Sequence, residues 1–298
     1  LLPGLAMARA LKLRCSGEEL LAVALGVGLA SSNVMFTLAG YAGVSWLYGL
    51  LPAGSACYLA WHSYLGRAGR KQVAAKTGPA ASILIVPVVA LAAGMLLQMP
   101  VHAVDFTPDA AGGLRLVVPP DGTLHVAIVS ELSRAWPPRN PFVGDQLLVY
   151  HYSTELAAAV LCKFLGLAPA AVSLRLLPTL FMTLAVLAVF AFIKRLTGSR
   201  AVALVAPLLV LLGEDFSFLP GLWQGSSGVW SAQYFASPAV FGLYFVNPNL
   251  PALAAFFCGL VGLNHAFRNG RTRWGWLALT AALLSLAGAY KVFFGMQL

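Results

Sequence analysis

Apolar residues run through this chain in long segments, and most charged residues occur in the short stretches between them. A helix that crosses a bilayer needs about 20 mostly apolar residues. About seven segments meet this requirement, some of them marginally. The pattern therefore predicts an all-α polytopic membrane protein. The predicted spans are roughly residues 19–40, 46–65, 79–99, 172–193, 196–213, 250–267 and 274–294.

An eighth apolar segment, residues 150–167, is shorter and carries polar and interfacial side chains. Clusters of Lys and Arg mark cytoplasmic loops. If this segment crossed the membrane, the two basic clusters after it would face the opposite side from the two before it. We therefore expect a juxtamembrane helix along the outer surface, with all four clusters cytoplasmic. The clusters are Arg9/Lys12/Arg14, Arg67/Arg70/Lys71/Lys76, Lys194/Arg195/Arg200 and Arg268/Arg271/Arg273.

This topology divides the chain into three parts. Residues 1–99 hold the N-terminal transmembrane helices, and residues 100–171 form an outer loop with juxtamembrane helices. Residues 172–298 hold further transmembrane helices, with a second outer loop at 214–249. The outer loops contain eight of the ten acidic residues, and the other two, Glu18 and Glu19, begin a helix where its dipole favours them. Because the chain starts and stops in apolar sequence, we expect it to be the front part of a longer protein.

The composition supports the membrane class. The chain is 59% hydrophobic and 10% charged, whereas soluble domains carry about a quarter charged residues. The net charge of +9 comes from the short loop clusters, which argues against nucleic-acid binding. The 4 cysteines form no CxxC motif and have no regular spacing, so the sequence predicts neither a disulfide framework nor a zinc site.

The densest chemistry lies in the first outer loop. Asp121 and His125 are four residues apart, so both face one direction if a helix begins with Asp121 at its N-cap. A carboxylate beside an imidazole near the membrane surface can act as a general base with an orienting partner. The spacing alone favours the plainer interpretation, in which Asp121 only caps the helix and His125 only lies at the interface.

Residues that suit a phosphate or a sugar follow this predicted helix. Arg139 and Asn140 lie in a proline-stiffened turn, and arginine forks fit phosphate oxygens such as those of a prenyl-phosphate headgroup. His151 follows Tyr150 and could hydrogen-bond a sugar or a phosphate. Snorkelling of arginine and the ordinary tyrosine belt of the membrane interface explain the same residues without a ligand.

Two further positions stand out beyond this loop. Glu214 and Asp215 follow the outer end of a helix, where carboxylates gain nothing from the dipole. They could supply a second acid or a cation ligand, and a solvated loop start explains them equally well. Lys291 lies in the apolar run 286–294, where a lysine is costly unless it snorkels or pairs, for example with a phosphate. No ligand spacing assigns a metal site, so a divalent cofactor stays open.

In this order, the residues resemble the GT-C superfamily of membrane glycosyltransferases, and among them uncharacterised, glycosyltransferase-39-like bacterial members. The resemblance covers about residues 100–298. It departs from the family at Gly122, which follows Asp121 where many members have an Asp-Glu pair. It rests on Asp121 near a helix start, the juxtamembrane segment, the Arg-Leu-Leu-Pro helix at 175–178, the basic turn at 194–198 and Ala-Tyr-Lys at 289–291.

The resemblance implies a sugar transfer from a polyprenyl-phosphate donor on the extracytoplasmic face of a bacterial cytoplasmic membrane. Asp121 matches the catalytic base and Lys291 a contact of the carrier phosphate, whereas Glu214 or Asp215 matches the second acidic position loosely. Membrane lipids and the lipid-linked donor are the implied partners.

We expect an inverting transfer in which His125 assists Asp121, while Arg139 and Lys291 stabilise the departing phosphate. The chief alternative is a multi-pass transporter or flippase, which predicts ionisable residues buried near the bilayer midplane. A polymerase or ligase of lipid-linked glycans and a scaffold subunit are further alternatives.

Overall fold

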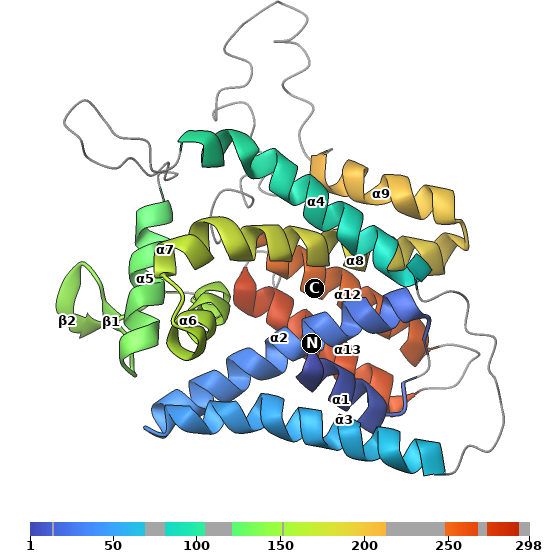
Figure 1. The fold of residues 1–298 in the computed structure, drawn as a ribbon, viewed down its shortest axis with the longest axis horizontal. Helices are drawn as coiled ribbons and strands as arrows, with labels where there is room; N and C mark the ends of the chain where they lie inside the picture. Colours follow the sequence, from blue (N-terminus) through green and yellow to red (C-terminus); the bar gives the residue numbers. More distant parts are fainter. Residues whose placement is uncertain are drawn as a thin grey trace, which may run out of the picture.

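The computed structural model describes residues 1–13, 15–68, 81–104, 121–150, 152–212, 248–267 and 273–291. Nearly all regular structure within them is helical, in agreement with the predicted all-α class (Figure 1). The helical elements are α1 (Leu2–Ala10), α2 (Gly17–Tyr41), the 3-10 turn η1 (Ser45–Gly49), α3 (Leu50–Ala68), α4 (Ala81–Val104), α5 (Gly122–Arg134), α6 (Ser153–Leu165), α7 (Pro169–Ala171), the π-helical turn η2 (Val172–Leu176), α8 (Leu177–Thr197), α9 (Arg200–Leu212), α12 (Asn249–Ala266) and α13 (Trp274–Tyr290).

Each predicted span corresponds to a helix in the described part of the chain. Among the described residues, three segments are long and apolar enough to cross a membrane, namely Gly17–Tyr41, Pro169–Thr197 and Asn249–Ala266. They indicate a membrane protein. Shorter apolar helices lie within α4, α9 and α13, whereas α3 is interrupted by polar and aromatic side chains in its second half. Length and composition therefore support three of the roughly seven predicted crossings.

The helices α2, α8, α12 and α13 share the main apolar core. α8 packs against α2, α4, α9 and α12, and α12 packs along α13 (Figure 1). Phe190 from α8 is buried in one cluster with Val27 from α2 and Leu283 from α13. α1 lies very close to α2 at Gly4, where an added Cβ would lie 1.8 Å from the carbonyl oxygen of Ala24. The absence of a side chain at Gly4 allows this approach.

One end of this bundle, which we call the basic end, joins the start of α2 to the end of α8. Lys194 Nζ donates to Glu18 Oε1 at 2.9 Å, and Arg195 Nη1 donates to Glu19 Oε1 at 3.0 Å. Ser16 and Glu19 form a capping box that begins α2. Both glutamates thus lie at a helix start, as predicted. Each also forms an ion pair with a residue of α8 that comes 176 residues later in the chain.

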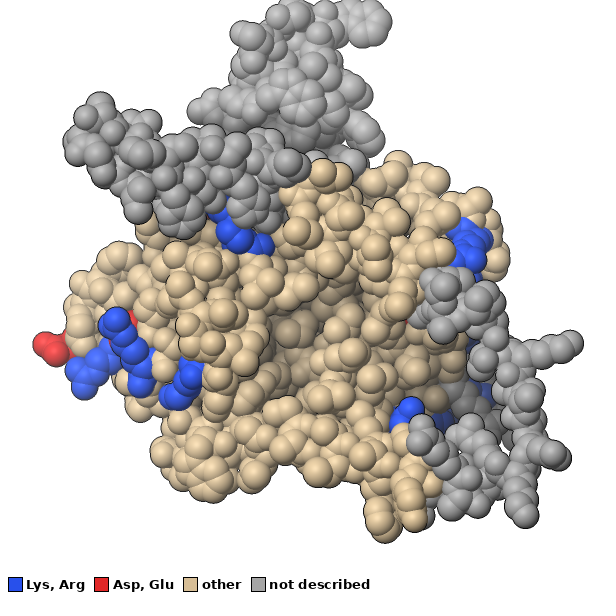
Figure 2. Space-filling model, in the orientation of Figure 1, with Lys and Arg blue, Asp and Glu red and all other residues tan. Residues whose placement is uncertain are grey.

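The opposite end carries α5, α6, α7 and a small hairpin, and we call it the α5–α6 end (Figure 1). α6 packs against α5 and α2. Its 13 residues extend about 20 Å, less than the hydrocarbon thickness of about 30 Å. α6 as described is therefore shorter than a bilayer crossing requires, and its juxtamembrane position stays a prediction. Figure 2, in the orientation of Figure 1, shows mainly uncharged surface over the middle of the molecule, with charged side chains towards its ends.

The hairpin is a departure from the predicted all-helical chain. Strands β1 (Arg139–Asn140) and β2 (Val143–Leu147) pair antiparallel within the first outer loop. The sequence analysis interprets this stretch only as a proline-stiffened turn. Two strands this short carry little hydrophobic periodicity, so the pattern gives no signal for them.

Candidate functional site

Asp121 stands immediately before the first turn of α5. It is the N-cap residue, as the sequence predicts, and its carbonyl oxygen accepts from the backbone N–H of His125 at 3.2 Å. Its side chain makes no capping hydrogen bond, although N-cap aspartates often do. The residue is exposed. The start of α5 therefore fixes the backbone position of Asp121, and the carboxylate is not used for capping.

One turn later, His125 faces inward and bonds to α6. Its Nδ1 makes a short hydrogen bond with Oε1 of Glu155, which comes 30 residues later in the chain. The two residues are 4% and 1% exposed, so the pair is closed off from solvent. Glu155 is thus a partner of this imidazole, whereas the spacing in the sequence predicts a pairing of His125 with Asp121. The geometry therefore turns His125 towards the α5–α6 interface.

Glu155 retains one unused oxygen in this buried place. Among the described residues, its Oε2 has no hydrogen-bond partner. Buried polar atoms are seldom left in this way, since each one costs the free energy of its lost hydration. In the sequence, Glu155 is recognisable as a carboxylate that directly precedes the apolar run 156–162. The sequence analysis places Glu155 in the juxtamembrane segment without giving it a role in the site.

Tyr150 completes the group at the entry to α6. Its ring lies edge-on to the His125 ring, with 6.3 Å between the centroids. Burial raises the pKa of the Tyr150 hydroxyl, and the negative charges of Glu155 and Asp121 raise it further. The hydroxyl therefore stays protonated at neutral pH and can donate a hydrogen bond. Asp121, His125, Tyr150 and Glu155 thus share one small region.

Aromatic side chains hold this region against the end of α2. The Trp136 ring stacks on the Tyr41 ring at 5.3 Å and 17°, and it lies 5.9 Å from the Phe36 ring. Phe36 is buried in one apolar cluster with Ile128 of α5 and with residues of α6. Contacts of this kind fix the position of α5 relative to α2, and hence the position of Asp121.

The hairpin holds the two residues predicted to bind a phosphate or a sugar. Arg139 Nη1 donates to the Gly144 carbonyl oxygen at 3.3 Å and lies 3.8 Å from Asp145 Oδ1, with both ion-pair partners exposed. Asn140 Oδ1 accepts from the Phe142 N–H at 2.9 Å. Both side chains therefore stabilise the hairpin turn, and their binding roles stay predictions.

Lys291 lies at the same end of the bundle. It follows Tyr290, the buried last residue of α13, and is itself half-buried. The Tyr290 hydroxyl accepts from Asn33 Nδ2 at 3.4 Å, and the same amide nitrogen donates to the Ser153 carbonyl oxygen at the start of α6. Asn33 therefore ties the end of α13 to α6. His151, Glu214 and Asp215, the other predicted site residues, lie outside the described residues.

A metal centre gains no support from the described part of the chain. No three side chains of His, Cys, Asp or Glu come close enough there to hold an ion.

Comparison with known proteins adds no relative. No family model, no curated protein and no solved structure matches the chain.

Proposed function

We propose that this chain is a membrane glycosyltransferase that moves a sugar from a polyprenyl-phosphate donor to an acceptor hydroxyl. The observation that carries the proposal is an exposed carboxylate, Asp121, held at the start of a helix that is fastened by the buried His125–Glu155 pair. This is the arrangement that a general base needs, because the base must be accessible and its position must be fixed.

The orientation in the membrane follows from the basic end. Lys194 and Arg195 lie there, and Lys12 and Arg273 line one cavity beside the starts of α2 and α13. Positive residues next to transmembrane helices face the cytoplasm. The α5–α6 end then faces outward. On this topology the candidate site meets the extracytoplasmic leaflet, and about seven helices cross the membrane.

In the proposed reaction, the acceptor hydroxyl passes its proton to the Asp121 carboxylate. The acceptor oxygen forms a bond to the anomeric carbon of the sugar, and the bond from that carbon to the phosphate oxygen breaks. The configuration at the anomeric carbon inverts, and the electron pair leaves with the polyprenyl phosphate. The acid formed on Asp121 releases its proton to water and regenerates the base.

His125 takes a different part from the one that its spacing suggests. At 4% exposure the imidazole is out of reach of an acceptor, so we assign it to positioning. Its bond to Glu155 fixes the first turn of α5 against α6 and so holds Asp121 in place. Tyr150, a protonated hydroxyl beside this pair, is suited to donate a hydrogen bond to a sugar or phosphate oxygen.

The departing phosphate needs positive charge at the place where its own charge develops. Lys291, at the end of α13, and Arg139, in the hairpin, are the cations of the α5–α6 end that we assign to this role. Arg139 is exposed, and its contact with Asp145 spans 3.8 Å between exposed atoms. Such a pair is weak, so a phosphate can take over the guanidinium at little cost.

The transporter alternative requires ionisable residues buried near the bilayer midplane. In the described spans, the buried ionisable residues are Glu18, Glu19 and His265, which lie within the first or last turn of α2 and α12. Asn33, a buried polar residue in the middle of α2, bonds to Ser153 and Tyr290 as a structural tie. These observations favour the enzyme.

The test is transfer in vesicles that contain the full chain and polyprenyl-phosphate-linked hexoses, with the release of polyprenyl phosphate as the readout. Asp121→Asn should reduce the rate by about a hundredfold or more, whereas Glu131→Gln, which changes a carboxylate of α5 that pairs with Arg134, should leave it unchanged. A fully active Asp121→Asn variant would contradict the assignment. Movement of the donor across the vesicle membrane without release of polyprenyl phosphate would favour the transporter.

A further inference from the structure

A second cavity lies at the basic end, away from the candidate site. It has a volume of about 370 Å³ and is bounded by the start of α2, the end of α8 and the end of α12. Its polar lining is Cys15, Ser16, Glu19, Lys194, Arg195 and His265. The proposed glycosyl transfer uses none of these side chains.

The two cations of this cavity are held in place and keep unused donors. Lys194 bonds to Glu18, while Arg195 bonds to Glu19 and, through Nε, to Asn264 Oδ1 at 2.7 Å. An ammonium group carries three donors and a guanidinium five. The contacts with described residues therefore occupy one donor of Lys194 and two of Arg195. The carboxylates therefore hold both cations in place and engage only some of their N–H donors.

His265 supplies the observation that points to a ligand. It is 1% exposed, and its ring stacks on Trp276 with 4.2 Å between the centroids and 8° between the planes. Nε2 lies 3.4 Å from Glu19 Oε2, a long contact, and Nδ1 has no hydrogen-bond partner among the described residues. A buried imidazole in this condition is costly. The missing partner belongs in the cavity that His265 lines.

We propose that this cavity binds a phosphate group through Arg195, Lys194 and His265. Ammonium, guanidinium and imidazole N–H groups all donate, and phosphate oxygens only accept. Glu19 is already engaged by Arg195 and by the Ser16 backbone N–H. The volume of about 370 Å³ holds a phosphate ester with room for its organic part.

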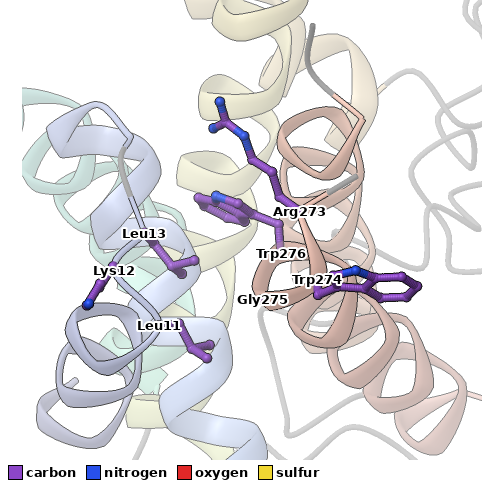
Figure 3. Close-up of a pocket in the computed structure, with 7 residues that line it drawn as sticks. All are labelled: Leu11, Lys12, Leu13, Arg273, Trp274, Gly275 and Trp276. Atoms are coloured by element: carbon purple, nitrogen blue, oxygen red, sulfur yellow. The ribbon is translucent and has the colours of Figure 1, made fainter. Parts of the chain in front are cut away.

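The phosphate has two possible sources, a lipid headgroup or a free phosphate ester. A neighbouring cavity of about 340 Å³ holds Lys12 and Arg273, with Trp276 on its wall (Figure 3). The stacked rings of His265 and Trp276 stand between the two cavities, since His265 lines one and Trp276 the other. Trp274, beside Arg273, is 76% exposed, as tryptophans at a membrane interface often are.

The first experiment measures the thermal stability of the purified chain with defined phosphate probes. One arm adds glycerol 3-phosphate in a neutral detergent, against sodium chloride of equal ionic strength. The other arm compares nanodiscs of phosphatidylglycerol with nanodiscs of phosphatidylcholine. A bound probe should raise Tm by about 2 °C or more at saturating concentration. A rise in the first arm identifies a free ester, and a rise in the second arm alone identifies a lipid headgroup. If neither probe raises Tm, the proposal is overturned.

The matched variants are His265→Phe and His62→Phe. Phenylalanine preserves the stack on Trp276 and removes both ring nitrogens, so the His265 variant should fold and should bind phosphate about tenfold or more weakly. His62 is an exposed histidine of α3 that lies near the Tyr58 ring, and its replacement should leave the binding unchanged. Equal phosphate affinity in both variants would show that His265 has only a packing role, and would overturn the proposal.

A second readout needs no variant. Cys15 lines the cavity and is half-buried, whereas Cys57 is exposed on α3. Phosphate in the cavity should slow the alkylation of Cys15 several-fold and leave that of Cys57 unchanged, as followed by mass spectrometry. Equal rates of Cys15 alkylation with and without a saturating probe would count against the site. This proposal does not depend on the glycosyltransferase assignment, and neither readout uses enzyme activity.

Discussion

Asn33, in the middle of α2, donates a hydrogen bond of 2.7 Å from Nδ2 to the backbone carbonyl oxygen of Ser153, the first residue of α6. The side chain is 4% exposed. A helix of the apolar bundle is thereby bonded directly to the start of the helix that carries Glu155. The position of the α5–α6 pair thus depends on a polar residue inside a membrane-spanning segment.

Asn33→Leu should therefore destabilise the chain, because it removes the hydrogen bonds that tie α2 to the start of α6 and to Tyr290. We expect a loss of about 1–3 kcal/mol in the free energy of unfolding, measured by thermal or denaturant unfolding in detergent. Ser31→Ala is the control, because the Ser31 hydroxyl bonds only within its own helix, to Val27 and Gly28. Equal stability of the two variants would contradict the structural role that we assign to Asn33.

The His125–Glu155 pair should behave as a coupled unit. His125→Phe or Glu155→Leu alone removes one member of this buried pair and should cost about 3–5 kcal/mol. The double variant removes both groups and should recover most of that loss, which a double-mutant cycle measures.

The exposed pair of Glu131 and Arg134, at 3.9 Å, provides the comparison. Glu131→Ala should change the stability by about 0.5 kcal/mol or less. Additive losses from His125→Phe and Glu155→Leu would show that the two side chains do not interact.

Gly40 allows the Trp136 ring to lie against α2. A Cβ at this position would come within 1.1 Å of Trp136 Nε1, whereas a Cβ at Gly49 meets nothing within 4 Å. Gly40→Ala should therefore displace the indole from Tyr41 and cost about 1–3 kcal/mol. Gly49→Ala should be nearly neutral. Unfolding curves together with near-UV circular dichroism check both the stability and the aromatic packing, and an unchanged spectrum for Gly40→Ala would contradict the geometry.

Cys15 should react with iodoacetamide only slowly near neutral pH. Burial and the nearby Glu19 carboxylate raise the pKa of its thiol to about 12, against the opposing charge of Arg195. The thiolate is the reactive form. Its fraction should therefore grow about tenfold per pH unit up to about pH 10, because the pH stays below the pKa. In the unfolded chain the rate should level off near pH 9, since an ordinary thiol has a pKa of about 8.5. A plateau near pH 9 in the folded chain would refute the shift.

The helices could be located from the sequence because their signals are local. The run predicted at 250–267 corresponds to α12, which spans Asn249–Ala266. α8 ends at Thr197, and its C-cap residue Gly198 has a left-handed φ of 69°, which suits a glycine. Gly198 belongs to the basic turn at 194–198, which is visible in the sequence. The N-cap position of Asp121 is local in the same sense. Apolar length and capping residues are sufficient for features of this kind.

The partners across the fold could not be predicted in this way. His125 has an acidic residue four positions before it, which suggests a local pair, and its buried partner Glu155 comes 30 residues later. The pairs of Glu18 with Lys194 and of Glu19 with Arg195 bridge 176 residues. Periodicity indicates which face of a helix is apolar, but it does not indicate which other helix meets a polar residue on that face.

The segment Pro169–Thr197 is longer than a bilayer requires. Its 29 residues would extend about 44 Å as a continuous helix, whereas the hydrocarbon layer is about 30 Å thick. α8 alone, with 21 residues, accounts for about 32 Å of this length. Both α5 and α6 pack against the stretch formed by α7 and η2. On the proposed topology this stretch extends beyond the hydrocarbon, so its length would set the distance between Asp121 and the lipid tails.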